Sequence, residues 1–289
     1  MTEYIIHLLI LISIYAILAL SLNLIFGYAG LMSLAHAAFF GIGAYTVAIL
    51  ETTMRMNFFP ALGIGVITTM LAAGLIGWVL SKFRDDYYTL GSLGFTFIVY
   101  AIMLNWQTLT GGPLGIPGIA RPAVFGIDFS LNVNFLLLSA VCLLLVYFIC
   151  NYIVKSSFGR ALKAIREDEQ ALSVFGYKVR NFKLAAFVIS AGLAAIAGAL
   201  FASYITYIDP STFNSVEAVF LWSIIILGGL ANLRGSMLGA LFLILLPELL
   251  RFVGFPNDVA AQMRQVIYGL LLILLMLYRP QGLMGEYKL

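Results

Sequence analysis

Charged residues are scarce in this chain, and their scarcity excludes an ordinary soluble fold. Asp, Glu, Lys and Arg make up only 10% of the 289 residues, whereas hydrophobic residues make up 62%. Soluble domains average about 25% charged residues, and a soluble chain this apolar could not cover its surface with polar groups. Lipid must therefore be the solvent for much of it, and we expect an all-α, polytopic membrane helix bundle.

Residues that bind metals or perform catalysis are also few. The chain has two histidines and two cysteines, Cys142 and Cys150, which lie in one apolar run where a straight helix disfavours a disulfide. No group of Cys and His has the spacing of a metal site. We therefore expect no catalytic residue, no metal and no bound cofactor, which disfavours an enzyme.

A nucleotide-binding loop is missing as well. The pattern Gly-x-x-x-x-Gly-Lys-Ser/Thr does not occur, and no glycine is followed by lysine. If ATP drives transport, separate partner chains must bind it. A self-contained secondary carrier or channel is the alternative, but its signature would be buried ionisable residues. The few candidates are His7, His36, Glu217 and Glu248.

Apolar runs broken by charge, Gly and Pro predict the membrane spans. The runs lie at 4–26, 31–50, 58–81, 88–105, 132–154, 184–205, 218–233, 236–253 and 264–279. The second is rich in small residues and the seventh and eighth are short, so broken or re-entrant elements are expected among them. We expect eight or nine crossings in a single domain over residues 1–289.

The basic residues predict the orientation. The stretch 155–183 holds seven of them: Lys155, Arg160, Lys163, Arg166, Lys178, Arg180 and Lys183. The positive-inside rule places this stretch in the cytoplasm, and nine spans then give an external N-terminus and a cytoplasmic C-terminus. An eight-span arrangement moves only the N-terminus, so charge leaves both open. The net charge of +3 is modest and localised, so it indicates topology and not nucleic-acid binding.

Glycine clusters interrupt two apolar runs, at 27–30 and 228–229. Transporters use broken helices at membrane depth where these line a cavity, and residues 30–36 also resemble residues 229–234 as a short internal repeat. Beside the first break, Asn23, Ser33 and His36 are candidates for the polar lining of a translocation pathway. For His36 the alternative is a packed imidazole bonded to a backbone carbonyl.

The loop 155–183 contains an amphipathic pattern. Ser156 or Ser157 can cap a helix in which Ala161, Leu162 and Ile165 share one face. A second short helix is expected to begin at the acidic residues 167–169, to take its apolar face from residues 171, 172 and 175, and to end at Gly176. Such an element either lies on the lipid surface or docks on a soluble partner, and three consecutive acids favour docking.

The loop from Thr110 to Pro117 contains three glycines and two prolines without charge. It is either a flexible connector or an extracytoplasmic gate that contacts a binding protein, because such loops can expose backbone donors. Thr110, Gly111 and Gly112 are therefore further candidates for the translocation pathway.

Four stretches together resemble the M-type permeases of high-affinity branched-chain amino acid ABC importers. They are Leu22–Tyr45, Thr110–Pro117, Phe158–Glu169 with the later Gly176, and Tyr278–Leu283, in the family's order. The resemblance implies a second homologous permease, two cytoplasmic ATPase subunits and an extracytoplasmic solute-binding protein as partners, beside membrane lipid.

The resemblance also implies a coupling helix within residues 156–183 that rests on the ATPase. Its candidate coupling residues are Arg160, Arg166, Glu167, Asp168, Glu169 and Gly176. The importer motif is Glu-Ala-Ala followed by Gly, and here Asp168 and Glu169 replace the alanines, which leaves the contact residues open.

The sequence therefore predicts a multi-pass permease of the bacterial plasma (inner) membrane that imports leucine, isoleucine and valine. Related permeases for urea, short amides or other amino acids share these motifs, so the substrate stays open at this point.

Overall fold

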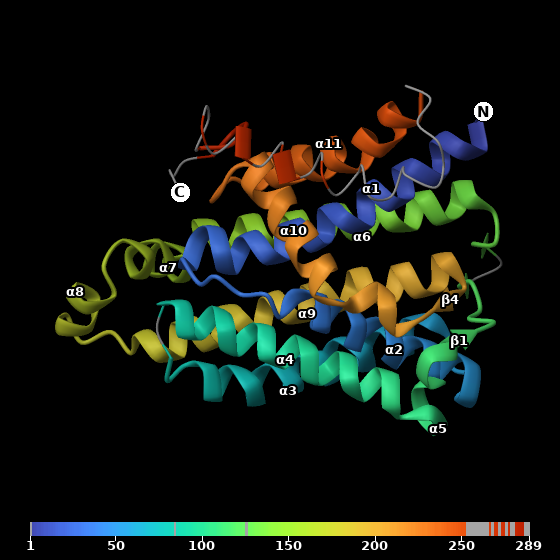
Figure 1. Ribbon diagram of the computed structural model, residues 1–289, viewed down its shortest axis with the longest axis horizontal. Coiled ribbons are helices and arrows are strands. Elements are labelled where there is room, and N and C mark those ends of the chain that lie inside the picture. The colour runs from blue at the N-terminus through green and yellow to red at the C-terminus, as the bar shows by residue number, and fades with distance from the viewer. Residues whose placement is uncertain are drawn as a thin grey trace.

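The computed structural model describes residues 2–83, 85–124, 127–252, 266, 269–270, 273–274, 277 and 281–285, and within them the fold is a helix bundle. Figure 1 shows the long helices running side by side, with α7 and α8 projecting at one end and α5, β1 and β4 at the opposite end. The helices are α1 (Thr2–Asn23), α2 (His36–Met54), α3 (Phe58–Leu80), α4 (Asp85–Asn105), α5 (Gln107–Thr110), α6 (Asn132–Lys155), α7 (Ser157–Glu167), α8 (Glu169–Val174), α9 (Val179–Ile205), α10 (Ser215–Gly228) and α11 (Leu233–Phe252).

Short irregular elements join them. A π-helical turn, η1 (Leu24–Tyr28), extends α1, and the 3₁₀ turns are η2 (Gly112–Leu114) and η3 (Pro210–Phe213). Strand β1 (Ile116–Pro117) pairs antiparallel with β4 (Tyr207–Ile208), with Ile116 opposite Ile208. Strand β2 (Ala123–Val124) pairs with β3 (Ile127–Asp128).

Six helices of the described part are long and apolar enough to cross a membrane: Thr2–Tyr28, His36–Met54, Phe58–Leu80, Asp86–Asn105, Asn132–Lys155 and Val179–Ile205. They match the first six predicted runs, except that the second helix begins only at His36. The expected total of eight or nine crossings is not confirmed. Helix α10 has 14 residues, about 21 Å at 1.5 Å per residue, and most of the predicted span 264–279 lies outside the described residues.

The outward faces of the bundle are apolar. Large side chains on α3 and α6 are exposed although they are hydrophobic: Ile67, Leu71, Leu75, Leu137, Val141, Leu144 and Phe148. In water such a surface would be unfavourable, whereas in a bilayer it contacts acyl chains. The chain is thus a multi-pass membrane protein.

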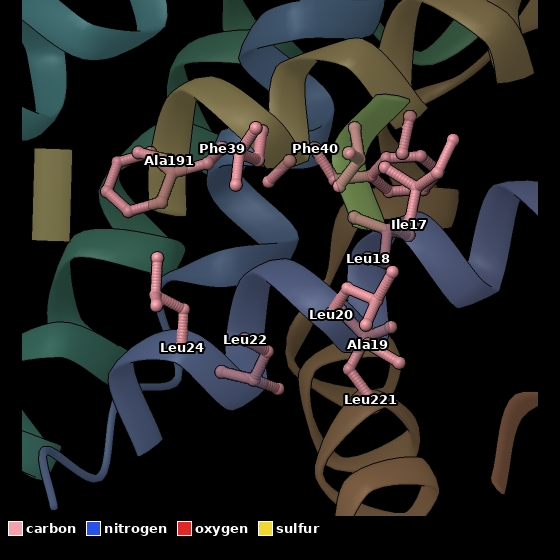
Figure 2. Close-up of a cluster of buried hydrophobic side chains, with 14 of the residues drawn as sticks. Ile17, Leu18, Ala19, Leu20, Leu22, Leu24, Phe39, Phe40, Ala191 and Leu221 are labelled. Carbon is pink, nitrogen blue, oxygen red and sulfur yellow. The ribbon is translucent and has the colours of Figure 1, made fainter. Parts of the chain in front are cut away.

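The core lies where α1, α2, α9 and α10 meet. Figure 2 shows Phe39 and Phe40 of α2 in one cluster with Ala191 of α9, Leu221 of α10 and the leucines of α1. Glycines let α2 and α9 approach closely, because a Cβ on Gly198 would lie 2.2 Å from the carbonyl oxygen of Phe40. Small residues are the usual means of such close helix packing in membranes.

Gly198→Ala is therefore expected to destabilise the bundle. The added methyl group must push α2 away from α9, and overpacking of this kind costs about 1–3 kcal/mol. The measurement is the midpoint of thermal unfolding in detergent, which should fall by several degrees. Gly63→Ala is the matched control, since a Cβ there meets nothing within 4 Å. Equal midpoints for the two variants would contradict the packing described here.

Candidate functional site

The first site feature is a break between α1 and α2. After Tyr28 the chain leaves the helix, Gly30 takes a left-handed conformation with φ of +69°, and the chain is non-helical from Gly30 to Leu34 until α2 begins. Gly30 suits this turn because it has no Cβ that would clash. We refer to residues 29–35 as the unwound segment. The break expected from the glycine cluster at 27–30 is confirmed.

Side chains of α4 satisfy the backbone of the unwound segment. Thr89 donates from Oγ1 to the Met32 carbonyl at 2.9 Å, and Thr96 donates to the Leu34 carbonyl at 2.9 Å. Ser92 Oγ accepts from the Leu34 N–H at 2.9 Å. These bonds are needed because lipid offers no partner to free backbone groups.

A fourth bond comes from α10, where Trp222 donates from Nε1 to the Ser33 carbonyl at 2.9 Å. Sequence reasoning missed all four of these partners. The hydroxyls at positions 89, 92 and 96 recur at helical spacing in an apolar span, and this signal could have identified the polar stripe.

The unwound segment reaches the middle of the bundle. Thr96 lies eleven residues beyond the first residue of α4, about 16 Å along the helix. A hydrocarbon core is about 30 Å thick, so the Leu34 backbone lies near its midplane if α4 starts at the interface.

Asn23 joins this break to the second one, between α10 and α11. Its Oδ1 accepts from the Ala231 N–H at 3.0 Å, and its Nδ2 donates to the Asn232 carbonyl at 3.0 Å and to Ser236 Oγ at 2.5 Å. Asn23 is fully buried, and Gly229 at the second break has φ of +111°. The two glycine-rich breaks are thus held together by one side chain. A lining role for Asn23 in the pathway stays a prediction.

Ser33 and His36 are buried at the same break. Ser33 Oγ accepts from the Ala35 N–H at 3.2 Å. The His36 ring stands edge-on to Phe39 with centroids 6.0 Å apart and lies near the Ser21 backbone. The Ser21 backbone is the polar group that faces this ring, so the packed imidazole and the lining role for His36 both stay predictions.

The remaining pathway candidates lie elsewhere. Thr110, Gly111 and Gly112 sit at the α5–β1 end (Figure 1), away from the α7–α8 end. Thr110 Oγ1 donates to the carbonyls of Met103 and Trp106 at 2.7 and 2.8 Å, and both glycines have positive φ. These turns and the β1–β4 pairing give the loop a defined conformation, which favours a specific surface over a flexible connector.

The α7–α8 end has the caps that the sequence predicted. Ser156 Oγ accepts from the Gly159 N–H and begins α7, whose buried face holds Ala161, Leu162 and Ile165. Asp168 Oδ1 accepts from the N–H groups of Gln170 and Ala171, both at 2.9 Å, and begins α8. Gly176 follows α8 with φ of +85°.

The apolar face expected on α8 packs only in part against this chain, through the partly buried Leu172. No residue of α8 is buried, and Val174 and Phe175 are 86% and 79% exposed. The expectation came from periodicity, which identifies an apolar face but not what covers it. Exposed large apolar side chains at the tip of a charged element are typical of a contact surface.

Helix α7 contacts the end of α1 directly. Arg166 donates from Nη1 to the Gly27 carbonyl, and its Cγ lies 2.9 Å from where a Cβ on Gly30 would be. The Lys163 ammonium lies 5.4 Å from the centre of the Tyr28 ring. Of the other coupling candidates, Glu169 pairs with Lys183, and Arg160, Glu167, Asp168 and Gly176 are exposed.

A cavity of about 430 Å³ separates the unwound segment from α7 and α8. Its lining combines the unwound segment and several coupling candidates, but no pathway candidate, with the start of α4 and α9: Gly30, Met32, Asp86, Tyr88, Arg166, Glu167 and Lys183. Asp86 and Lys183 were not singled out from the sequence. The cavity places charged groups of the projecting element next to the helix break.

The amino-acid sequence of the chain is similar to those of known proteins over most of its length. The family model described as "Branched-chain amino acid transport system / permease component" matches residues 4–276. The high-affinity branched-chain amino acid transport system permease protein LivM of Escherichia coli K12 is 35% identical over 94% of this chain and 68% of its own length. The probable branched-chain amino acid transport permease protein LivM of Methanocaldococcus jannaschii is 26% identical over 94% of this chain and 91% of its own.

A second kind of permease from the same E. coli strain also matches. Its high-affinity branched-chain amino acid transport system permease protein LivH is 25% identical over 95% of this chain and 92% of its own length. No solved structure is significantly similar to the chain.

Proposed function

Because the chain belongs to the family of branched-chain amino acid transport system permease components, we propose that it is the membrane-spanning subunit of an ATP-driven importer of leucine, isoleucine and valine. The relatives that cover nearly all of the chain carry names for this substrate class. The observation that carries the ATP-driven mechanism is the contact of α7 with the break after α1. It gives a partner bound to α7 and α8 a direct mechanical connection to the membrane bundle.

The proposed partners follow from the same features. E. coli has two related permeases named for one kind of system, which supports pairing of this chain with a second, homologous permease. Two cytoplasmic ATPase subunits would complete the importer. One of them would bind the exposed face of α8, with Val174 and Phe175 filling a cleft on it, and the other would bind the second permease. An extracytoplasmic binding protein would deliver the solute at the α5–β1 end. ATP would be bound only by the ATPase subunits.

The charge of the loop supports the orientation. Residues 155–183 carry seven basic residues, so the α7–α8 end would face the cytoplasm of a bacterial plasma membrane. The C-terminus would lie on the same side.

The mechanism would be an alternation between two arrangements of the bundle. Closure of the ATPase dimer would move α7, and Arg166 would transmit this movement to Gly27 and the unwound segment. Rigid-body rocking around a helix break is a common way to alternate access.

Co-purification tests the proposed assembly. The tagged chain is extracted from its native membrane in a mild detergent, and its partners are identified by mass spectrometry. We expect two copies of an ATPase chain and one homologous permease for each tagged chain. A chain that repeatedly emerges alone and still transports leucine in liposomes without ATP would overturn the proposal and favour a secondary carrier.

A further inference from the structure

Two basic side chains share one exposed tryptophan ring at the α7–α8 end of the bundle. Trp78, near the end of α3, is 54% exposed. The Lys82 ammonium lies 4.8 Å from the centre of its ring, and Cζ of Arg180, in the first turn of α9, lies 5.7 Å from it. Both cations are exposed. Two positive charges around one ring attract an anion more strongly than either charge alone.

The end of α3 holds the Arg180 guanidinium in place. Its Nε donates to Ser81 Oγ at 2.7 Å, and its Nη2 donates to the Trp78 carbonyl at 3.2 Å. A guanidinium has five N–H donors, so Arg180 keeps donors for a further acceptor. In the described part of the chain neither Lys82 nor Arg180 forms an ion pair, and the nearby Asp86 lines the cavity beside Gly30. The two cations therefore form a positioned positive site without a counter-ion among these residues.

An apolar stripe on α3 leads to this site. Ile67, Leu71 and Leu75 follow one another at one-turn spacing, Trp78 continues the same face, and each is more than half exposed. The stripe runs about 16 Å along the helix from Ile67 to Trp78. Half of a hydrocarbon core is about 15 Å thick, so the stripe has the length of one leaflet.

The order of these groups selects a phospholipid as the partner. A phospholipid presents an apolar tail, then an interfacial region, then a headgroup, and the surface presents an apolar stripe, then a tryptophan, then two cations. Tryptophan is typical of the headgroup level of a bilayer. The charge selects an acidic lipid, because basic residues near the membrane surface attract anionic headgroups, whereas the amine of a zwitterionic headgroup is repelled by the same cations.

We propose that Lys82, Arg180 and the Trp78 ring bind the headgroup of an acidic phospholipid whose acyl chain lies along the apolar stripe of α3. The inference does not depend on what the protein transports, because it uses only the position of the bundle in a membrane. The bound headgroup joins the end of α3 to the first turn of α9, shortly after α8. It thereby fixes the base of the projecting α7–α8 element.

Photo-cross-linking tests the site directly. The photoreactive residue p-benzoylphenylalanine replaces Leu75 on the stripe, or Ile149 as the matched control, which is exposed on α6 about as far from the same end of the bundle. The protein, with any chains that co-purify, is reconstituted in liposomes of equal parts phosphatidylglycerol and phosphatidylethanolamine and irradiated. Mass spectrometry of the adducts gives the ratio of the two lipids at each position, which does not depend on the cross-linking yield.

We expect the ratio of phosphatidylglycerol to phosphatidylethanolamine at position 75 to exceed that at position 149 by about five-fold or more, since one basic residue near the surface already contributes about this factor. Lys82→Gln combined with Arg180→Gln should remove the enrichment, whereas Lys82→Arg, which keeps the charge, should retain it.

Three results would overturn the inference. They are equal lipid ratios at the two positions, an enrichment that survives the loss of both charges, and cross-links from position 75 to another protein chain in place of lipid. The last result would show that this face of α3 is a protein interface.

Discussion

Arg166→Ala is expected to uncouple ATP hydrolysis from leucine uptake. The guanidinium of Arg166 donates to the Gly27 carbonyl, and its side chain fills the space beside Gly30. Without it, α7 can move while the unwound segment stays in place. A lost charged hydrogen bond of about 1.5–3 kcal/mol corresponds to roughly a ten-fold or larger effect, so uptake should fall at least about ten-fold.

The measurement is uptake and ATP hydrolysis in the same proteoliposomes. ATP hydrolysis should persist in the Arg166→Ala complex, because α8 and its exposed face are unchanged. Lys155→Ala is the matched control, because Lys155 is an exposed basic residue at the end of α6, just before α7, and is not a coupling candidate. Similar uptake in the two variants would show that the contact with Gly27 carries no coupling.

Asn23→Ala is expected to cause a large loss of stability for the truncation of a single polar side chain. Asn23 is fully buried, and its amide bonds the Ala231 N–H, the Asn232 carbonyl and Ser236 Oγ. Truncation leaves the Ala231 N–H unpaired at a buried position, whereas the Asn232 carbonyl keeps its hydrogen bonds from Ser236. A buried unpaired group costs about 1–3 kcal/mol, so the loss of stability should fall in this range.

Thermal unfolding in detergent provides the measurement, with Asn105→Ala as the matched control. Asn105 is exposed and its Nδ2 donates at 2.8 Å to the Ala101 carbonyl one turn earlier in the same helix, so its removal should change the unfolding midpoint little. Asn23→Ala should lower the midpoint by several degrees and also impair uptake, since both helix breaks lose their connection. An unfolding midpoint equal to that of the control would refute the role given to Asn23.

Local features of this fold could be read from the sequence because neighbouring residues determine them. Ser156 or Ser157 was expected to cap α7, and the acidic residues 167–169 to begin the second helix, since an oxygen two or three residues before free N–H groups suffices. Gly30 marked the first break because the turn needs a positive φ. The resemblance to the permease family likewise rested on contiguous motifs, and the family match over residues 4–276 confirms it.

Features that depend on distant residues could not be read in this way. The bonds from Thr89, Thr96 and Trp222 to the unwound segment join positions far apart in the chain, and a polar residue in an apolar span does not reveal its partner. The same holds for Arg166, which was predicted as a contact to an ATPase and in the structure also bonds Gly27. The predicted number of crossings is not confirmed, because α10 has only 14 residues and most of the predicted span 264–279 lies outside the described residues.

ATP-dependent uptake of labelled leucine by the purified complex in proteoliposomes is the decisive measurement of the proposed function. We expect uptake that requires ATP on the α7–α8 side and the binding protein on the other, is inhibited by isoleucine and valine, and is not inhibited by urea or acetamide. Leucine accumulation that proceeds at the same rate without ATP, or a complex that moves urea but not leucine, would contradict it.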